Sequence, residues 1–218
     1  MPQQKLKDRM MRMTGFLGLF TILLLGATNR PAFALQLGAY PDITMDESIS
    51  VDFSGGIFSA IGVASKYKTS TGSSDYLIKP YFELYATIIG GALATGGNNY
   101  LAIYDDIGGV SGVYDAGIDH PYLSGTVTSI NYSAGNPVLD ILFTVTGGDY
   151  KGDFGDIGST GGVILGDSGY NSSAFSSAFS SLSGKADVGT PVPEPSTISL
   201  LLLGAGGLCF LRRRKSLS

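Results

Sequence analysis

Few side chains in this 218-residue chain are of the types that carry out chemistry. Its only histidine, His120, precedes a proline, and its only cysteine, Cys209, lies in an apolar run near the C-terminus. Nucleophilic catalysis requires a base beside a nucleophile, and a catalytic metal centre requires several converging nitrogen or carboxylate ligands. The sequence therefore predicts a protein that is not an enzyme, with His120 as a surface loop residue.

A cluster of acidic and glycine residues over positions 148–156 is the best candidate for binding a metal ion. Asp149, Asp153 and Asp156 are spaced along this segment, and calcium is bound by several oxygens that a flexible loop presents. The spacing matches neither the EF-hand loop nor the nonapeptide calcium repeat. We therefore expect a solvated turn and no cofactor, with a calcium site as the alternative.

The chain holds twelve tyrosines and no tryptophan. Exposed aromatic rings commonly stack on sugars, and several tyrosines fall in strand-like segments that could form such a platform: Tyr67, Tyr81, Tyr85, Tyr100 and Tyr104. Tyrosine is also a good strand former that pairs across sheets. We expect core or cross-strand packing, and keep a secreted carbohydrate-binding module or a glycoside hydrolase as the alternative function. A hydrolase would need two facing carboxylates.

The N-terminus carries the three parts of a secretory signal peptide. Four basic residues come first, followed by an apolar run over residues 16–25 and by Ala32-Phe33-Ala34, in which Ala32 and Ala34 are small residues two positions apart. We predict cleavage by signal peptidase after Ala34, so that residues 1–34 form a removable signal helix. The competing interpretation is an uncleaved anchor, which the short apolar run disfavours.

The C-terminus has a second three-part pattern. Pro193-Glu194-Pro195 is followed by a mostly apolar run that ends at Leu211, and then by four basic residues: Arg212, Arg213, Arg214 and Lys215. The prolines exclude helix from the tripeptide. As a helix the apolar run spans roughly 22 Å, which makes it a short transmembrane helix. The basic residues would stay in the cytoplasm and leave the rest of the chain outside.

This order of elements over residues 192–218 resembles the PEP-CTERM sorting signal of exported bacterial proteins. The resemblance implies that Pro193, Glu194 and Pro195 are recognised by an exosortase, a membrane-embedded cysteine enzyme of the protease or transpeptidase type. It also implies that the helix anchors the precursor in the membrane and that the basic cluster from Arg212 to Lys215 stops transfer. Members of that family are associated with extracellular polysaccharide and biofilm, and their central domains vary greatly.

The part of the chain between the two signals is strongly acidic. From Leu35 to Thr190 it contains five lysines, no arginine and 16 acidic residues, a net charge of −11. Nucleic acid and anionic lipid both require a cationic surface, so neither is expected as a partner. This part also lacks cysteine, so its fold depends on a hydrophobic core rather than on disulfides.

Apolar and polar residues alternate over several segments of this central part, as in strands with one buried face. The clearest runs are Ile49 to Phe53, Phe82 to Ile88 and Leu139 to Val145. No segment between Leu35 and Tyr170 shows a helical stripe. We therefore predict an all-β domain over residues 35–170, an antiparallel β-sandwich of the jelly-roll kind. A short β-solenoid is the alternative.

Residues 171–191 have a different composition, rich in serine and alanine, with two copies of Ser-Ala-Phe-Ser-Ser. We predict a linker that tethers the domain to the sorting signal. A short docked helix that presents Phe175, Ala178, Phe179 and Leu182 on one face is an equally weighted alternative.

The resulting hypothesis is an exported protein, anchored to the membrane as a precursor and found at the cell surface or outside the cell after processing. We expect a structural or adhesive role in association with exopolysaccharide or biofilm. The expected partners are signal peptidase and exosortase during export, the membrane through the C-terminal helix, and extracellular polysaccharide.

Overall fold

The computed structural model describes the chain between Leu35 and Val192, and the residues it describes belong to one compact unit. The described ranges are 35–75, 80–105, 114–115, 117–132, 138–171 and 175–192. The predicted signal helix, transmembrane helix, sorting tripeptide, basic cluster and signal peptidase site lie outside these ranges. Within them, no helix has the length and apolar character that crossing a membrane requires.

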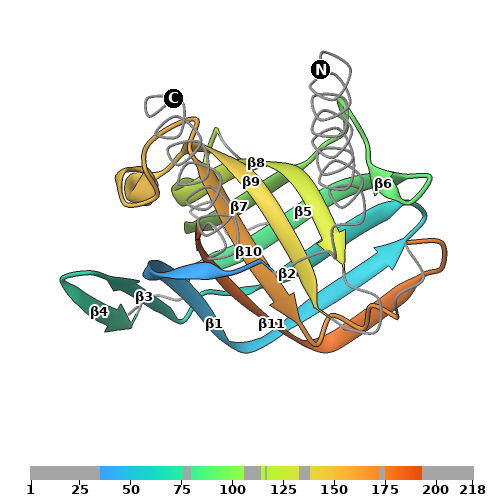
Figure 1. Ribbon diagram of the computed structural model, residues 1–218, viewed down its shortest axis with the longest axis horizontal. Helices are drawn as coiled ribbons and strands as arrows, with labels where there is room; N and C mark the ends of the chain where they lie inside the picture. The colour runs from blue at the N-terminus through green and yellow to red at the C-terminus, as the bar shows by residue number, and fades with distance from the viewer. Residues whose placement is uncertain are drawn as a thin grey trace, which may run out of the picture. The chain divides into compact units, whose positions relative to one another are not determined.

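Eight antiparallel strands form a closed barrel (Figure 1). In chain order they are β1 (Leu37–Ser54), β2 (Ile57–Val63), β5 (Tyr81–Ile89), β7 (Tyr100–Asp105), β8 (His120–Tyr132), β9 (Leu139–Gly147), β10 (Thr160–Gly166) and β11 (Phe179–Pro191). Neighbours around the barrel follow the order β11-β10-β9-β8-β7-β5-β2-β1, and β11 also pairs with β1, which closes the ring.

The all-β prediction is correct, but the predicted β-sandwich is wrong. A sandwich has two sheets packed face to face, whereas here one sheet curls until its first and last strands pair, as in the side-by-side course of β1 and β11 in Figure 1. The alternation of inward and outward residues is the same in both folds. The sequence pattern therefore could not separate them, and the β-solenoid alternative is not found either.

The predicted linker over residues 171–191 is also corrected by the structure. Phe179 to Pro191 form β11, which pairs antiparallel with both β1 and β10. Gly184, Ala186 and Val188 are buried, whereas Leu182 is 83% exposed, so the apolar face of the alternative helix does not exist. The folded domain thus continues to residue 191.

Three short strands extend the sheet beyond the closed ring. The hairpin of β3 (Lys66–Thr69) and β4 (Gly72–Asp75) continues from β1, and β6 (Ala92–Leu93) pairs with the end of β5. β1 has 18 residues, so its residues 42–44 pair with β3 while residues 50–54 pair with β2. The single described helix is the 3₁₀ turn η1 (Asp149–Gly152).

The barrel interior is filled by side chains, as expected for eight strands. Residues predicted to face inward are buried in all three of the clearest runs: Ile49, Val51, Phe53, Phe82, Leu84, Ala86, Ile88, Leu139, Ile141, Phe143 and Val145. The Phe143 ring occupies space that two glycines leave open: a Cβ on Gly125 would lie 2.4 Å from it, and one on Gly161 would lie 2.1 Å from it. The absence of a side chain at these two glycines therefore leaves the space that the Phe143 ring occupies.

Candidate functional site

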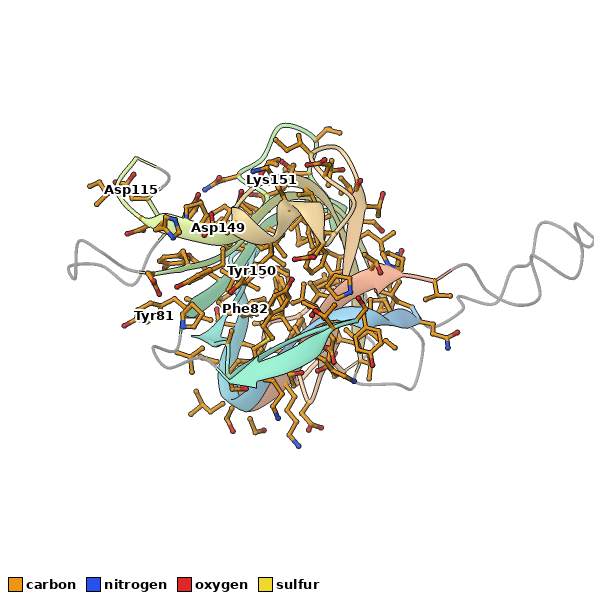
Figure 2. The ribbon with its side chains drawn as sticks, turned by 90° about the vertical axis from the view of Figure 1, so that its left-hand side faces the viewer. Tyr81, Phe82, Asp115, Asp149, Tyr150 and Lys151 are labelled. Atoms are coloured by element: carbon orange, nitrogen blue, oxygen red, sulfur yellow. The ribbon has the colours of Figure 1, made fainter. Side chains whose placement is uncertain are left out.

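Tyrosines gather on the outer surface of β5 and β7. Phe82 and Leu84 point into the barrel, so Tyr81 points outward, and Figure 2 shows Tyr81 at the margin of the molecule and Phe82 toward its middle. The register places Tyr81 opposite Tyr104 and Tyr85 opposite Tyr100. Both pairs are stacked, with ring centroids 5.8 Å apart. We call Tyr81, Glu83, Tyr85, Tyr100 and Tyr104 the tyrosine face.

A buried carboxylate, Glu83, lies at the centre of the tyrosine face and is only 3% exposed. The Tyr100 hydroxyl donates to its Oε1 at 2.6 Å, and the backbone N–H of Tyr114 donates to its Oε2 at 2.7 Å. The Tyr104 hydroxyl donates a longer bond of 3.4 Å to Oε2. Burial, reinforced by the hydrogen bond from the Tyr100 hydroxyl to Glu83, raises the pKa of Tyr100 above its usual range. Both carboxyl oxygens of Glu83 thus accept hydrogen bonds, from β7 and from the chain beyond it.

Exposure differs sharply among these tyrosines. Tyr104 is fully buried, Tyr85 and Tyr100 are partly buried, and Tyr81 is 39% exposed. Cross-strand packing, the expected arrangement, is therefore present, and a ring surface open to a ligand is confined to Tyr81 and the accessible parts of Tyr85 and Tyr100.

Tyr67 belongs to a different cluster, near η1. Its ring is buried and stacks on Tyr150 with centroids 4.0 Å apart, and Tyr150 stacks in turn on Tyr122. The Tyr67 hydroxyl donates to Asp153, and the Tyr122 hydroxyl donates to Asp105 Oδ2 at 2.7 Å. This hydrogen bond, together with burial, raises the pKa of Tyr122 to about 12.

The three acidic residues of the calcium hypothesis lie in three different settings. Asp149 lies 3.5 Å from His120 Nε2 at the surface, Asp153 accepts from Tyr67, and Asp156 adopts a left-handed backbone with φ 78°. Figure 2 shows Asp149 on the η1 segment beside Tyr150. In the described part of the chain, no three His, Cys, Asp or Glu side chains are grouped to hold a metal ion. The solvated turn without a cofactor stays a prediction, and the calcium site stays its alternative.

An open cleft of about 510 Å³ lies at the barrel end formed by the β1–β2 turn. Its apolar walls are Phe53, Ile88 and Phe175, and its rim consists of glycines and small residues: Ser54, Gly55, Gly56, Gly90, Gly91, Ser176, Ser177 and Ala178. These lining residues bring no titratable group to the cleft, so it offers apolar contact rather than chemistry.

The first and last described residues of the chain meet at one place on the barrel. The register pairs Leu37 with Pro191, and the backbone N–H of Val192 donates to the Gln36 carbonyl oxygen at 2.9 Å. The backbone N–H of Leu35 donates to Asp140 Oδ2 at 2.9 Å. We call this arrangement the terminal junction.

Sequence reasoning did not single out Glu83 or Asp140, the two buried carboxylates that organise these sites. Each occupies an outward position in a well-patterned strand, where a charged residue is unremarkable. The signal peptidase residues Ala32 and Ala34, the tripeptide Pro193, Glu194 and Pro195, and the basic cluster from Arg212 to Lys215 lie outside the described residues.

Comparison with known proteins identifies the function of the C-terminal segment. The PEP-CTERM protein-sorting motif matches residues 191–215, so the match begins at the last residue of β11. No curated protein and no solved structure matches the chain. The matched segment confirms the resemblance seen in the sequence. The chain therefore carries a PEP-CTERM protein-sorting motif, which indicates an exported protein that an exosortase processes and that is targeted to the cell surface.

Proposed function

We propose that the barrel is a non-enzymatic, structural or adhesive component of the cell surface or extracellular matrix, held in association with exopolysaccharide or biofilm. The observation that carries this proposal is the use of carboxylates as fixed acceptors for tyrosine hydroxyls, at Glu83, Asp105 and Asp153. A carboxylate engaged in this way supports packing between strands. An acid–base pair, in contrast, needs carboxyl groups free to exchange protons with a substrate.

The acidic charge of the exported part agrees with this role. A net charge of −11 between Leu35 and Thr190 keeps an extracellular protein soluble and directs it toward neutral or cation-bridged polymers rather than polyanions. The packed barrel interior leaves the outer surface as the place for contact with a partner.

The tyrosine face is the surface of the barrel that best suits contact with polysaccharide. Tyr81 is exposed beside the partly exposed rings of Tyr85 and Tyr100, which offers aromatic area to a sugar ring. This observation favours the second candidate, a carbohydrate-binding module, in which the same barrel binds a defined glycan. The two candidates differ in whether binding is selective for one sugar.

The test is sedimentation of the exported, processed protein with purified extracellular polysaccharide of the host and with a set of neutral glycans. Tyr81→Ala should lower the bound fraction severalfold. Tyr40→Ala is the matched control, because Tyr40 is 45% exposed on β1 and lies away from the tyrosine face.

The outcomes separate the candidates. Binding across many polymers supports the adhesive role, and binding to one glycan supports the carbohydrate-binding module. An equal loss in both variants, or no binding at all, overturns the polysaccharide association. Release of reducing sugar by the wild-type protein overturns the non-enzymatic assignment.

A further inference from the structure

Asp140 is an unusual carboxylate on the outer side of β9. Its neighbours Leu139 and Ile141 point into the barrel, yet Asp140 is only 7% exposed. Its Oδ2 accepts the backbone N–H of Leu35 at 2.9 Å. Its Oδ1 is buried and has no hydrogen-bond partner among the residues that the structure describes. A buried carboxylate oxygen without a donor is costly.

The chain reaches Asp140 by crossing the outside of β10. A Cβ on Gly162, an outward position of β10, would lie 2.9 Å from Leu35 Cδ2 and 2.9 Å from Leu37 Cδ2. Gly189 on β11 leaves similar room, because a Cβ there would lie 3.3 Å from Leu37 Cβ. The two glycines let the segment 35–37 lie flat on the barrel, with Leu35 N directed at β9.

The strand neighbours of Asp140 supply no opposite charge. Its register partners are Asn131 on β8 and Ile164 on β10. The residue opposite Ile164 on its other side is Asp187, which is itself acidic. Burial raises the pKa of Asp140, and the Leu35 N–H offsets this only in part. The Asp140 carboxylate can therefore accept more hydrogen bonds than the single one that the Leu35 amide donates.

We propose that signal peptidase creates this donor, and that Asp140 is the binding site for the α-ammonium group of the mature N-terminus at Leu35. Cleavage after Ala34 adds water across the peptide bond: the oxygen goes to the Ala34 carbonyl carbon, the C–N bond breaks, and the Leu35 nitrogen takes up protons. The products are an Ala34 carboxylate and a Leu35 ammonium. The amide nitrogen at 2.9 Å from Asp140 becomes a cation with three hydrogens.

Conversion of the Leu35 amide to an ammonium group supplies the additional hydrogen-bond donors that the Asp140 carboxylate lacks. One hydrogen keeps the bond to Oδ2, a second is available as a donor for Oδ1, and the positive charge favours the ionised form of Asp140. Removing the signal peptide therefore tightens the mature end onto β9 and β10. The inference does not depend on the adhesive role of the barrel, since it concerns maturation alone.

The test uses the exported, processed protein. N-terminal sequencing should start at Leu35. Competitive labelling with trace acetic anhydride over a pH series then gives the pKa of the α-amine. In the wild type it should lie at least about one unit above the ordinary value of ~8, because an opposite charge within hydrogen-bonding distance favours the ammonium. Asp140→Asn should return it to the ordinary range, and Asp167→Asn, a surface control, should leave it raised.

A second variant covers the case in which Asp140→Asn fails to fold. One alanine inserted between Ala34 and Leu35 moves the new ammonium off the Asp140 site without changing the barrel, so its α-amine should titrate in the ordinary range and the thermal midpoint should fall. A wild-type α-amine in the ordinary range overturns the proposal. A mature chain that starts at another residue overturns it as well.

Discussion

The backbone N–H of Val192 donates a hydrogen bond to the carbonyl oxygen of Gln36, at 2.9 Å. Gln36 is two residues beyond the predicted signal peptidase site, and Val192 directly precedes Pro193 of the sorting motif. A residue shortly after the predicted signal peptidase site and the residue that precedes the sorting tripeptide therefore lie at neighbouring positions of the barrel. Since β11 ends at Pro191, only Val192 separates the barrel from the sorting tripeptide.

Glu194→Ala should leave the precursor unprocessed at its C-terminus in a host that carries an exosortase, because the substitution removes the only charge of the recognised tripeptide. Intact mass of the membrane and extracellular fractions measures the result. Asp52→Asn, at an exposed position of β1, is the control and should be processed normally. Equal amounts of the shortened form from Glu194→Ala and from the wild type would contradict the assignment.

Val188→Ala should lower the free energy of unfolding by about 2 kcal/mol, because Val188 is fully buried in β11 and the truncation leaves a cavity. Leu182→Ala is the matched control on the same strand. Leu182 is 83% exposed, and its truncation should change the stability by no more than about 0.5 kcal/mol. Chemical denaturation of both proteins measures the difference. Two neutral substitutions would mean that residues 179–191 behave as a linker.

Gly161→Ala should destabilise the barrel by about 1–3 kcal/mol, because the new methyl group would overlap the Phe143 ring. Gly166→Ala on the same strand is the control, since a Cβ there meets nothing within 4 Å. Thermal melts of the two variants give the comparison. Phe143→Leu combined with Gly161→Ala should cost less than the sum of the single substitutions, and simple additivity would argue against this contact.

Stability should fall as the pH rises from about 10 to about 12. The Asp105 hydrogen bond, followed by burial, raises the pKa of Tyr122 from 10.0 to about 12. Between these values the unfolded chain releases a proton that the folded chain keeps, so the contribution is complete below pH ~10 and is lost through the folded pKa. Denaturant midpoints at stepped pH, with tyrosinate absorbance as a second signal, measure the slope.

Tyr122→Phe should reduce that slope, because the titrating hydroxyl is gone. Asp105→Asn should shift the Tyr122 titration to lower pH, since the charged acceptor is replaced by a neutral amide. An unchanged slope in Tyr122→Phe would show that other groups account for the alkaline loss.

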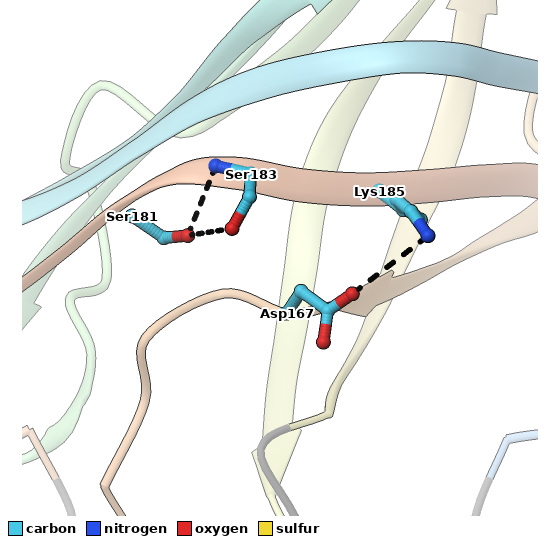
Figure 3. A network of polar contacts seen from close by, with 4 residues as sticks. All are labelled: Asp167, Ser181, Ser183 and Lys185. Atoms are coloured by element: carbon cyan, nitrogen blue, oxygen red, sulfur yellow. Dashed lines mark hydrogen bonds and ion pairs between the residues drawn. The ribbon is translucent and has the colours of Figure 1, made fainter.

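The strands with a clear alternation of apolar and polar residues were predictable, because that alternation is visible within each short segment. Phe82, Leu84, Ala86 and Ile88 alternate with polar or tyrosine positions, and all four are buried. β11 was missed because its inward residues are small: Gly184, Ala186 and Val188 alternate with Ser183, Lys185 and Asp187. Figure 3 shows the outward side of this strand, with Ser181 and Ser183 hydrogen-bonded and Lys185 Nζ 4.0 Å from Asp167. The serine-rich composition suggested a linker, whereas its two-residue period was the informative signal.

The candidate site was predictable only in part. Residue types and order over the last segment were sufficient for the sorting motif, because the motif is a pattern of consecutive residues. The stacking partners of the tyrosines followed from strand register, which depends on how β5 and β7 pair. The roles of Glu83 and Asp140 depended on donors brought from elsewhere in the fold.

The sequence alone thus determined the sorting signal and most of the secondary structure, since signal segments and strand alternation are properties of short stretches of chain. The closed ring of strands, the terminal junction and the buried carboxylates that accept hydrogen bonds were determined only by the tertiary structure. Leu35 and Asp140 are 105 positions apart, and contact between such distant residues arises only when β11 completes the barrel against β1. No local pattern encodes that closure, because it depends on the pairing of β1 with β11 and on the burial of their inward residues against the rest of the core.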